Sequence, residues 1–281
     1  MRYAASGPCF NSNGCRYRNG VIIDLQLNQG SAPWSLLHEA VLAAEETGYS
    51  TIWNLDHFSG ANFGSDSMLE CFTSLTAWAT ATKNIKVGTL VTNVMNREPG
   101  LLANIVSSIQ HISGNRLLLG IGAGTSPNSP WNGEQMALGM PLLPTMAQRH
   151  ERLIEIVELM KHLWSAERDE KFQGFPRPDV NPPIIIGTNS EALARIAGEH
   201  ADGVNTRFNH PKRAELLATA RAAAQHRDDF DVTVWSPFVP EYADPSHSFH
   251  QELVSEGATR LVMFHMGTPD LSLISSVRKY L

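Results

Sequence analysis

Short apolar runs and longer segments with apolar residues at every third or fourth position alternate along residues 20–281. A short apolar run between turn residues is typical of a buried strand, and the wider spacing is typical of a helix with one face in a core. The runs that predict strands are 21–27, 51–58, 85–93, 117–121, 183–187, 203–206, 232–239 and 261–265. The segments that predict helices include 33–47, 68–82, one that starts after Pro99, one that carries Leu153 to Leu163, 190–200, 211–226 and 271–280.

This order predicts an α/β fold with a parallel sheet, because a helix returns the chain to the start of each next strand. Eight strands alternating with helices in 281 residues correspond to a single-domain (β/α)8 TIM barrel over residues 20–281. Residues 1–19 lack the pattern and are rich in Gly, Pro and Asn, so we expect an irregular N-terminal arm. Residues 125–146 carry four prolines, which is typical either of a lid or substrate loop or of a surface insertion without function.

The composition favours an ordinary cytoplasmic enzyme. With 42% hydrophobic and 18% charged residues, no window approaches the roughly 18 uninterrupted apolar residues that a membrane helix needs. Residues 1–19 contain no apolar stretch of the kind found in secretory signals. The net charge of -6 and the lack of a Lys/Arg-dense run argue against a nucleic-acid partner. The expected ligand is a small molecule.

No metal site is predicted. The three cysteines, Cys9, Cys15 and Cys71, match none of the common zinc spacings, so we expect reduced thiols. Metal-dependent barrel hydrolases use His-x-His on the first strand, where this chain has Asp24-Leu25-Gln26. A Schiff-base aldolase needs a lysine well inside a strand, and Lys86 lies at a strand entrance. Both classes are disfavoured.

The carboxyl ends of barrel strands carry function, and Asp56 with His57 is the most reactive pair there. Imidazole titrates near neutrality, and a neighbouring carboxylate can accept its hydrogen bond. Adjacent residues of a strand point to opposite faces, so both can face a pocket only if the strand ends before them. The other interpretation is that Asp56 caps a loop and His57 packs against neighbours; the residues alone leave both open.

The turn Gly187-Thr188-Asn189 precedes the helix that begins near Ser190. Such a turn can point free backbone N–H groups at a phosphate, although it is equally compatible with a plain strand-to-helix turn. Gly120, Gly122 and Gly124 follow G-x-G-x-G spacing with no helix directly after them, which argues against a dinucleotide fingerprint. They do permit a flat ring to approach the backbone closely.

Four stretches in order resemble the bacterial luciferase-like monooxygenase superfamily, whose members are TIM barrels that use FMN or the deazaflavin coenzyme F420. The stretches are GYSTIWNLDHF (48–58), VGTLVTNVMNREP (87–99), SGNRLLLGIGAG (113–124) and PIIIGTNSEALARIAGEHADGVN (183–205). Asp-His-Phe at 56–58 is similar to the F420-dependent branch. Sugar-phosphate dehydrogenases of that branch place a glutamate after the glycine exit, where this chain has Thr125, so that substrate is disfavoured.

The resemblance implies hydride transfer between F420 and a small organic substrate, with His57 as acid/base and Asp56 as a cofactor contact. It also implies a non-prolyl cis peptide in a bulge at Leu90-Val91, a phosphate site at Gly187, Thr188 and Asn189, and a homodimer. The residues implied to line the ring are Leu90, Val91, Thr92, Asn93, Ala123, Gly124 and Asn128. The alternatives are an FMN-dependent monooxygenase, a cofactor-free phosphate-binding isomerase or lyase that uses Asp56 and His57, and a ligand-binding relative without turnover.

Overall fold

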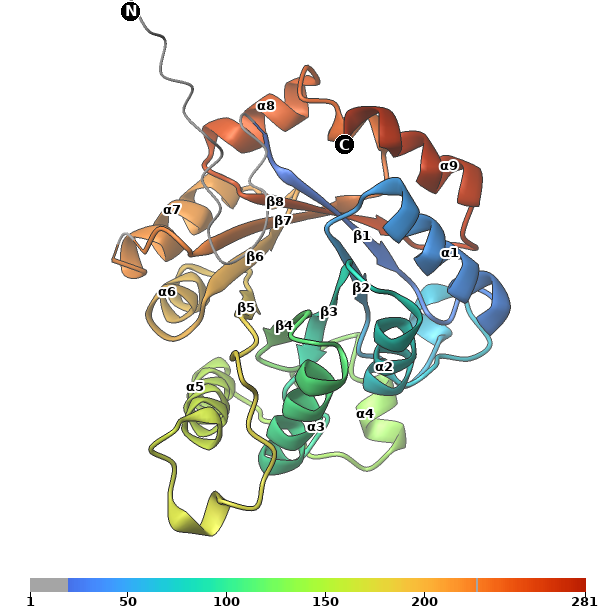
Figure 1. The fold of residues 1–281 in the computed structure, drawn as a ribbon. Helices are drawn as coiled ribbons and strands as arrows, with labels where there is room; N and C mark the ends of the chain where they lie inside the picture. The colour runs from blue at the N-terminus through green and yellow to red at the C-terminus, as the bar shows by residue number, and fades with distance from the viewer. Residues whose placement is uncertain (1–19, 226) are drawn as a thin grey trace, which may run out of the picture.

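Eight parallel strands close into a barrel in the order β1 to β8, each paired with its neighbours in sequence and β8 paired with β1 (Figure 1). The computed structural model describes residues 20–225 and 227–281, so the predicted arm at 1–19 lies outside the described residues. The strands are β1 Ile22–Leu27, β2 Thr51–Asn54, β3 Lys86–Asn93, β4 Leu117–Gly122, β5 Ile184–Gly187, β6 Gly203–Arg207, β7 Asp231–Pro237 and β8 Arg260–His265. The predicted TIM barrel is confirmed.

The helices form a ring around the strands (Figure 1). They are α1 Trp34–Thr47, α2 Cys71–Ala81, α3 Pro99–Ile112, α4 Gly133–Ala137, α5 Met146–Trp164, α6 Glu191–His200, α7 Arg213–Ala223, α8 Ser248–Ser255 and α9 Leu271–Ser275. Short 3-10 turns lie at η1 Ala61–Phe63, η2 Glu170–Phe172, η3 Pro240–Ala243 and η4 Ser276–Tyr280. The helix predicted at 271–280 is therefore a short α-helix that tightens into a 3-10 turn.

Several predicted boundaries are wrong, each for a local reason. Strand β2 ends at Asn54, because the backbone N–H groups of Leu55 and Phe58 donate to side chains of other loops, Gln29 and Glu134. Helix α2 begins at Cys71 because the Glu70 side chain accepts from Thr73 N at 2.6 Å. Helix α7 ends at Ala223, and Gln225 then adopts a φ of 52°. Segment 125–146 contains the short helix α4.

The barrel interior is packed with side chains. Five buried residues from five strands form the inner cluster: Trp53, Leu90, Leu118, Ile185 and Val262. A Cβ at Gly88 would lie 2.5 Å from the Trp53 ring, so glycine makes room for that indole. Towards the amino end, Arg260 donates to both carboxylate oxygens of Asp24 at 3.0 and 2.8 Å. A filled barrel leaves its two rims as the places where a ligand can approach.

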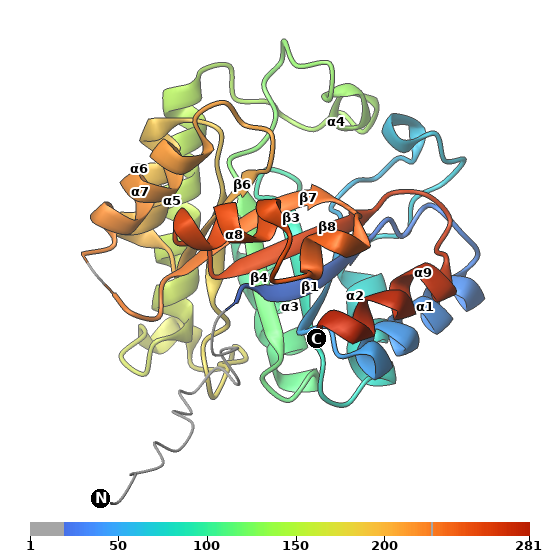
Figure 2. The same ribbon diagram turned by 90° about the horizontal axis from the view of Figure 1, so that it is seen from above.

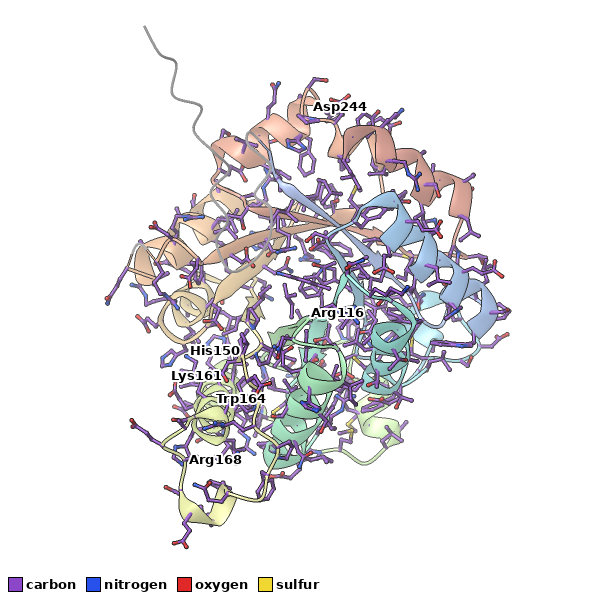
Figure 3. All side chains as sticks on the ribbon, in the orientation of Figure 1. Arg116, His150, Lys161, Trp164, Arg168 and Asp244 are labelled. Atoms are coloured by element: carbon purple, nitrogen blue, oxygen red, sulfur yellow. The ribbon has the colours of Figure 1, made fainter. Side chains whose placement is uncertain are left out.

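The amino-end rim is fastened by Arg116, labelled in Figure 3. Its guanidinium donates to the backbone carbonyls of Ala79, Thr82 and Ile85, which fixes the connection between α2 and β3. Within 20–225 and 227–281, no helix is long and apolar enough to cross a membrane, and no group of three or more acidic, His or Cys side chains could hold a metal. Cys71 is a buried free thiol, as predicted, while Cys9 and Cys15 lie outside the described residues.

Candidate functional site

The loops that follow the strands build a rim on which segment 125–146 stands clear of the helical ring (Figure 2). This segment follows β4 and carries α4. The loop after β2 contributes Asp56 and His57, and the end of β3 contributes Asn93 to Arg97. Because β2 ends at Asn54, the alternation of a strand does not constrain Asp56 and His57, and each side chain has its own partners on the rim.

Asp56 is buried and accepts hydrogen bonds from three residues at the end of β3. Arg97 binds it in a bidentate pair, with Nη1 and Nη2 each at 2.8 Å from a carboxylate oxygen. Asn93 N donates at 2.9 Å and Asn96 Nδ2 at 3.3 Å. Burial would lower the pKa of Arg97, but its hydrogen bonds and attraction to Asp56, together with its bond to Glu70, raise that pKa. Asp56 therefore ties two loops of the rim together.

His57 is paired with a residue from segment 125–146. Its Nδ1 lies 2.9 Å from Glu134 Oε1, and its ring meets Phe63 edge-on at 4.9 Å between centroids. Glu134 Oε2 also accepts from Phe58 N at 2.8 Å and Ser59 N at 3.1 Å. Nδ1 is occupied, whereas Nε2 has no hydrogen-bond partner among the described residues. His57 thus offers one nitrogen to a ligand at the rim.

The peptide bond Leu90-Val91 is cis, as the resemblance implies, and the pairing of β3 with β4 shifts register between Thr89 and Thr92. The half-buried Val91 side chain lies against the inner face of the next two strands. A Cβ at Gly122 would lie 2.9 Å from Val91 Cγ2, and one at Gly187 would lie 3.0 Å from Val91 Cγ1. The space left by the missing side chains of these two glycines is therefore filled by Val91 and is not open to a ligand.

A buried amide links four strands just below the rim. Gln26 Nε2 donates to Leu90 O at 2.6 Å and to Asn54 O at 3.1 Å, and Gln26 Oε1 accepts from Trp235 Nε1 at 2.6 Å. The network joins β1, β2, β3 and β7 without using a charged group. It fixes the carbonyl of the residue that precedes the cis bond.

The predicted phosphate turn is only partly free. Thr188 N donates to Asn205 O at 2.7 Å, and Thr188 Oγ1 donates to Ser190 O at 3.0 Å. Ser190 caps α6, because its Oγ accepts from Leu193 N at 3.3 Å. Asn189 makes no hydrogen bond to any described residue and is exposed. Asn189 and the first turn of α6 are thus the groups available to an anion.

Two buried polar atoms without partners lie beside this turn. Asn205 Oδ1 and Thr233 Oγ1 have no hydrogen-bond partner, and the two residues are neighbours in the pairing of β6 with β7. Val204, Val232 and Val234 pack outward under the helices, so Asn205 and Thr233 point into the barrel. Asn205 is the register partner of Gly187 at the rim, so its Oδ1 is the one of the two that a ligand bound at the turn could reach, whereas Thr233 pairs with Arg260 and is fully buried.

The other predicted ring residues have different surroundings. Thr92 is fully buried and donates to Thr89 Oγ1 at 2.8 Å, and Asn93 Oδ1 accepts from Met95 N at 3.0 Å. Ala123 and Gly124 are half-buried at the end of β4, and Asn128 is exposed in the following loop. Gly124 has a φ of 86°, and a Cβ there would lie 2.5 Å from Met95 Cγ. Leu90 belongs to the inner cluster.

Sequence reasoning predicts no role for four residues of this site: Gln26, Arg97, Glu134 and Trp235. Two of them had a signal in the sequence: Arg97 follows a predicted strand, and Gln26 is a polar residue near the end of the first apolar strand. Glu134 had none, because it lies 77 positions from His57 in a segment without periodicity.

Comparison with known families assigns the architecture. The family model described as luciferase-like monooxygenase matches residues 20–265. The chain belongs to this family. The match covers the whole barrel through β8, so the rim described above is the family's rim and not that of an unrelated barrel.

Curated relatives of this luciferase-like chain include F420-dependent enzymes. A 5,10-methylenetetrahydromethanopterin reductase from Archaeoglobus fulgidus is 30% identical over 210 residues, which are 70% of this chain and 58% of the relative. An F420-dependent hydroxymycolic acid dehydrogenase from Mycobacterium tuberculosis is 28% identical over 193 residues, which are 65% of this chain and 52% of the relative. The alignments thus span little more than half the length of these relatives.

Solved structures share the fold of the luciferase-like chain at low identity. An F420-dependent secondary alcohol dehydrogenase in complex with an F420-acetone adduct has a TM-score of 0.74 and 17% identity, covering 94% of this chain and 98% of the other. An EDTA monooxygenase from Chelativorans sp. BNC1 has a TM-score of 0.69 and 14% identity, covering 93% and 94%. These likenesses establish the fold alone.

Proposed function

We propose that this protein is an oxidoreductase that transfers a hydride between coenzyme F420 and a small organic substrate. The observation that carries the proposal is His57, held at the rim by Glu134 with Nε2 left for a ligand. The family membership and the F420-dependent relatives support the choice of cofactor. When bound, the deazaflavin would supply the hydride-accepting or hydride-donating carbon.

The described residues fit such a cofactor. Asn189 and the N-terminal turn of α6 would bind its phosphate, and the orphaned Asn205 Oδ1 would accept a hydrogen bond from its polar edge. Val91, Ala123 and Gly124 would line the ring. Asp56 would act indirectly, because its oxygens already accept from Asn93, Asn96 and Arg97.

His57 would move the proton that accompanies the hydride. In the neutral ring a proton on Nδ1 faces the Glu134 carboxylate, which leaves Nε2 as the base; in the charged ring Nε2–H is the acid. Thr125, in place of an acidic residue, disfavours a sugar phosphate as the substrate. Arg97 is already paired with Asp56 and Glu70, so it would not bind a substrate anion.

A titration of the purified protein with F420 and with FMN, followed by absorbance and fluorescence, tests the proposal. We expect saturable binding of F420. Tighter binding of FMN with oxygen-dependent turnover would favour the monooxygenase alternative, and binding of neither cofactor would refute both and favour a cofactor-free barrel. Binding without turnover over a panel of alcohols, imines and alkenes would indicate a relative that only binds the ligand.

The His57→Ala variant separates chemistry from binding. We expect turnover to fall by about 10²- to 10⁴-fold with a much smaller change in the Kd of F420, since a proton-transfer group acts mainly on the chemical step. Equal losses in both measurements would argue against the acid/base role.

Asn189→Asp tests the phosphate turn by placing a negative charge beside the expected anion, so F420 should bind more weakly. Asn181→Asp is the matched control, because it adds the same charge before β5 at the opposite rim. Equal affinities of the two variants would mean that the turn is only structural.

We also infer a homodimer and a cytoplasmic location, on the resemblance and the composition. Sedimentation equilibrium of the full chain would give twice the 30.9 kDa chain mass for a dimer. Fractionation of the source cells would test the location.

A further inference from the structure

Glu134 is deeply buried although its surroundings are open to solvent. Its side chain is 3% exposed, whereas four apolar side chains of the same segment, Trp131, Met136, Leu138 and Met146, are between 54% and 62% exposed. Burial would raise the pKa of the Glu134 carboxyl, but the hydrogen bond and charge of His57 and the N–H groups of Phe58 and Ser59 outweigh it and lower that pKa. A charged carboxylate is therefore inserted into the rim from a segment with few other attachments.

The carboxylate of Glu134 determines which nitrogen of the His57 ring carries the proton. An ionised carboxylate can only accept hydrogen bonds, so the nitrogen it faces, Nδ1, carries a proton. The tautomer of a histidine is set by the hydrogen bond that its other nitrogen makes. Nε2 is thereby left as an acceptor at the rim in the neutral ring.

A second bond from the same turn reaches the other half of the rim. Gln135 Nε2 donates to Asn96 Oδ1 at 3.1 Å, and Asn96 Nδ2 donates to Asp56 Oδ2 at 3.3 Å. Helix α4 begins at Gly133 and is followed by Gly139, and a Cβ at either glycine would meet nothing within 4 Å. Segment 125–146 is thus attached to the rim by two consecutive side chains between two unpacked glycines.

We propose that Glu134 is the positioning residue for His57, and that docking of segment 125–146 assembles the proton-transfer group. With the segment docked, Glu134 fixes the tautomer that presents Nε2 to the ligand. With the segment undocked, His57 loses the carboxylate and the rim opens. This inference rests on the proposed function for its role in turnover, but the effect of Glu134 on the His57 ring is a property of the protein alone.

The alternative is that Glu134 only satisfies the backbone N–H groups of Phe58 and Ser59. The two roles separate in the ¹⁵N spectrum of the protein without cofactor, labelled at histidine, recorded at a pH where the ring is neutral and assigned with His57→Gln. The wild type should show protonated Nδ1. In Glu134→Ala the ¹⁵N shifts of His57 should move towards protonated Nε2. Glu134→Gln keeps the bonds from Phe58 N and Ser59 N through its carbonyl, so its NH2 group faces Nδ1 and the shifts should move in the same direction as in Glu134→Ala.

Gln135→Ala is the matched control for looser docking. Gln135 Nε2 donates to Asn96 Oδ1 and also to Glu134 Oε1, each at 3.1 Å, so the variant removes both bonds but leaves the carboxylate facing His57. Because an ionised carboxylate still accepts from Nδ1, the tautomer should persist while amide hydrogen exchange across segment 125–146 accelerates. If Glu134→Ala keeps protonated Nδ1, or if Gln135→Ala changes the tautomer equally, the proposal is wrong. Circular dichroism of each variant establishes that it is folded.

Turnover provides the second readout. We expect both Glu134→Ala and Glu134→Gln to lower kcat by at least about tenfold with a smaller change in the Kd of F420, because neither presents an acceptor to Nδ1. If the tautomer responds as expected but no deazaflavin binds, the positioning role stands and the proposed function fails. If F420 is turned over but the tautomer does not respond, the positioning role fails and the proposed function stands.

Discussion

Replacing Asp56 with Asn separates the two roles open to this residue. The resemblance implies that Asp56 contacts the cofactor, whereas the structure engages its oxygens with Asn93, Asn96 and Arg97. If the carboxylate is a tie between loops, its loss should reduce the free energy of unfolding. If it is a ligand contact, its loss should reduce cofactor affinity first.

The expected cost follows from what remains around Arg97. Removing one partner of a buried ion pair costs about 3–5 kcal/mol. Arg97 keeps Glu70 at 2.6 Å, and the carbonyl of the new Asn can still accept from Asn93 N, so we expect a smaller cost than that range, about 2–3 kcal/mol. At about 2–4 °C per kcal/mol for a chain of this size, the melting temperature should fall by about 4–12 °C.

Urea unfolding and calorimetry measure the first effect, and F420 titration measures the second. The affinity should change by less than about tenfold, which corresponds to about 1.4 kcal/mol. Glu70→Gln is the control, since Glu70 is 41% exposed and its pair with Arg97 should contribute no more than about 1 kcal/mol. Unchanged stability together with a hundredfold loss of affinity would refute the structural role of Asp56 and support a direct contact between Asp56 and the cofactor.

Three further predictions concern the frame of the site. Gly120→Ala should destabilise the protein by about 3 kcal/mol or prevent folding, because its Cβ would lie 2.1 Å from Thr89 O, whereas Gly174→Ala, with nothing within 4 Å, should be neutral in urea unfolding. Asp24→Asn should cost about 2–3 kcal/mol, less than a full loss of partners, because Arg260 keeps Asp231 at 3.6 Å; a calorimetric loss below about 1 kcal/mol would contradict this. Folding lowers the pKa of Glu134, so the stabilisation by its carboxylate is complete above the usual pKa of 4.5 and is lost as the pH falls through the lowered pKa. The amide chemical shifts of Phe58 and Ser59 should therefore titrate below pH 4.5 in the wild type. In Glu134→Gln the same shifts should not change with pH.

The fold could be predicted because its signal is local and repeated. Each strand is a short apolar run and each long helix a periodic stripe, so one misjudged boundary does not change the topology. The boundary at Asn54 could not be predicted, because the residues that follow it look like a strand and are held away from the ladder by Arg97, 41 positions from Asp56. Helix α8 has only eight residues, too few to give a clear periodic stripe.

Candidate site residues could be predicted from the sequence only where they lie near the carboxyl end of a predicted strand. His57 and Asn189 follow strands directly, and topology alone places both at the rim. Glu134 could not be found this way, because it lies among prolines and polar residues and reaches His57 only through the path of the loop. For Asp56, the predicted role as a cofactor contact stays a prediction, and the network that occupies its oxygens could not be predicted because it depends on three residues of another loop.

The rim divides into a part fixed by the barrel and a part, segment 125–146, that is held by few contacts. The amide of Gln26 binds β2, β3 and β7 from within, so the wall around Leu90 is held by strands that cannot separate without opening the barrel. Glu134 and Gln135 belong to a segment whose other described side chains are largely exposed. His57 lies where the two parts meet. Under the proposed docking, a ligand would enter by displacing the segment without disturbing the wall, and the return of Glu134 to His57 would reassemble the proposed proton-transfer group.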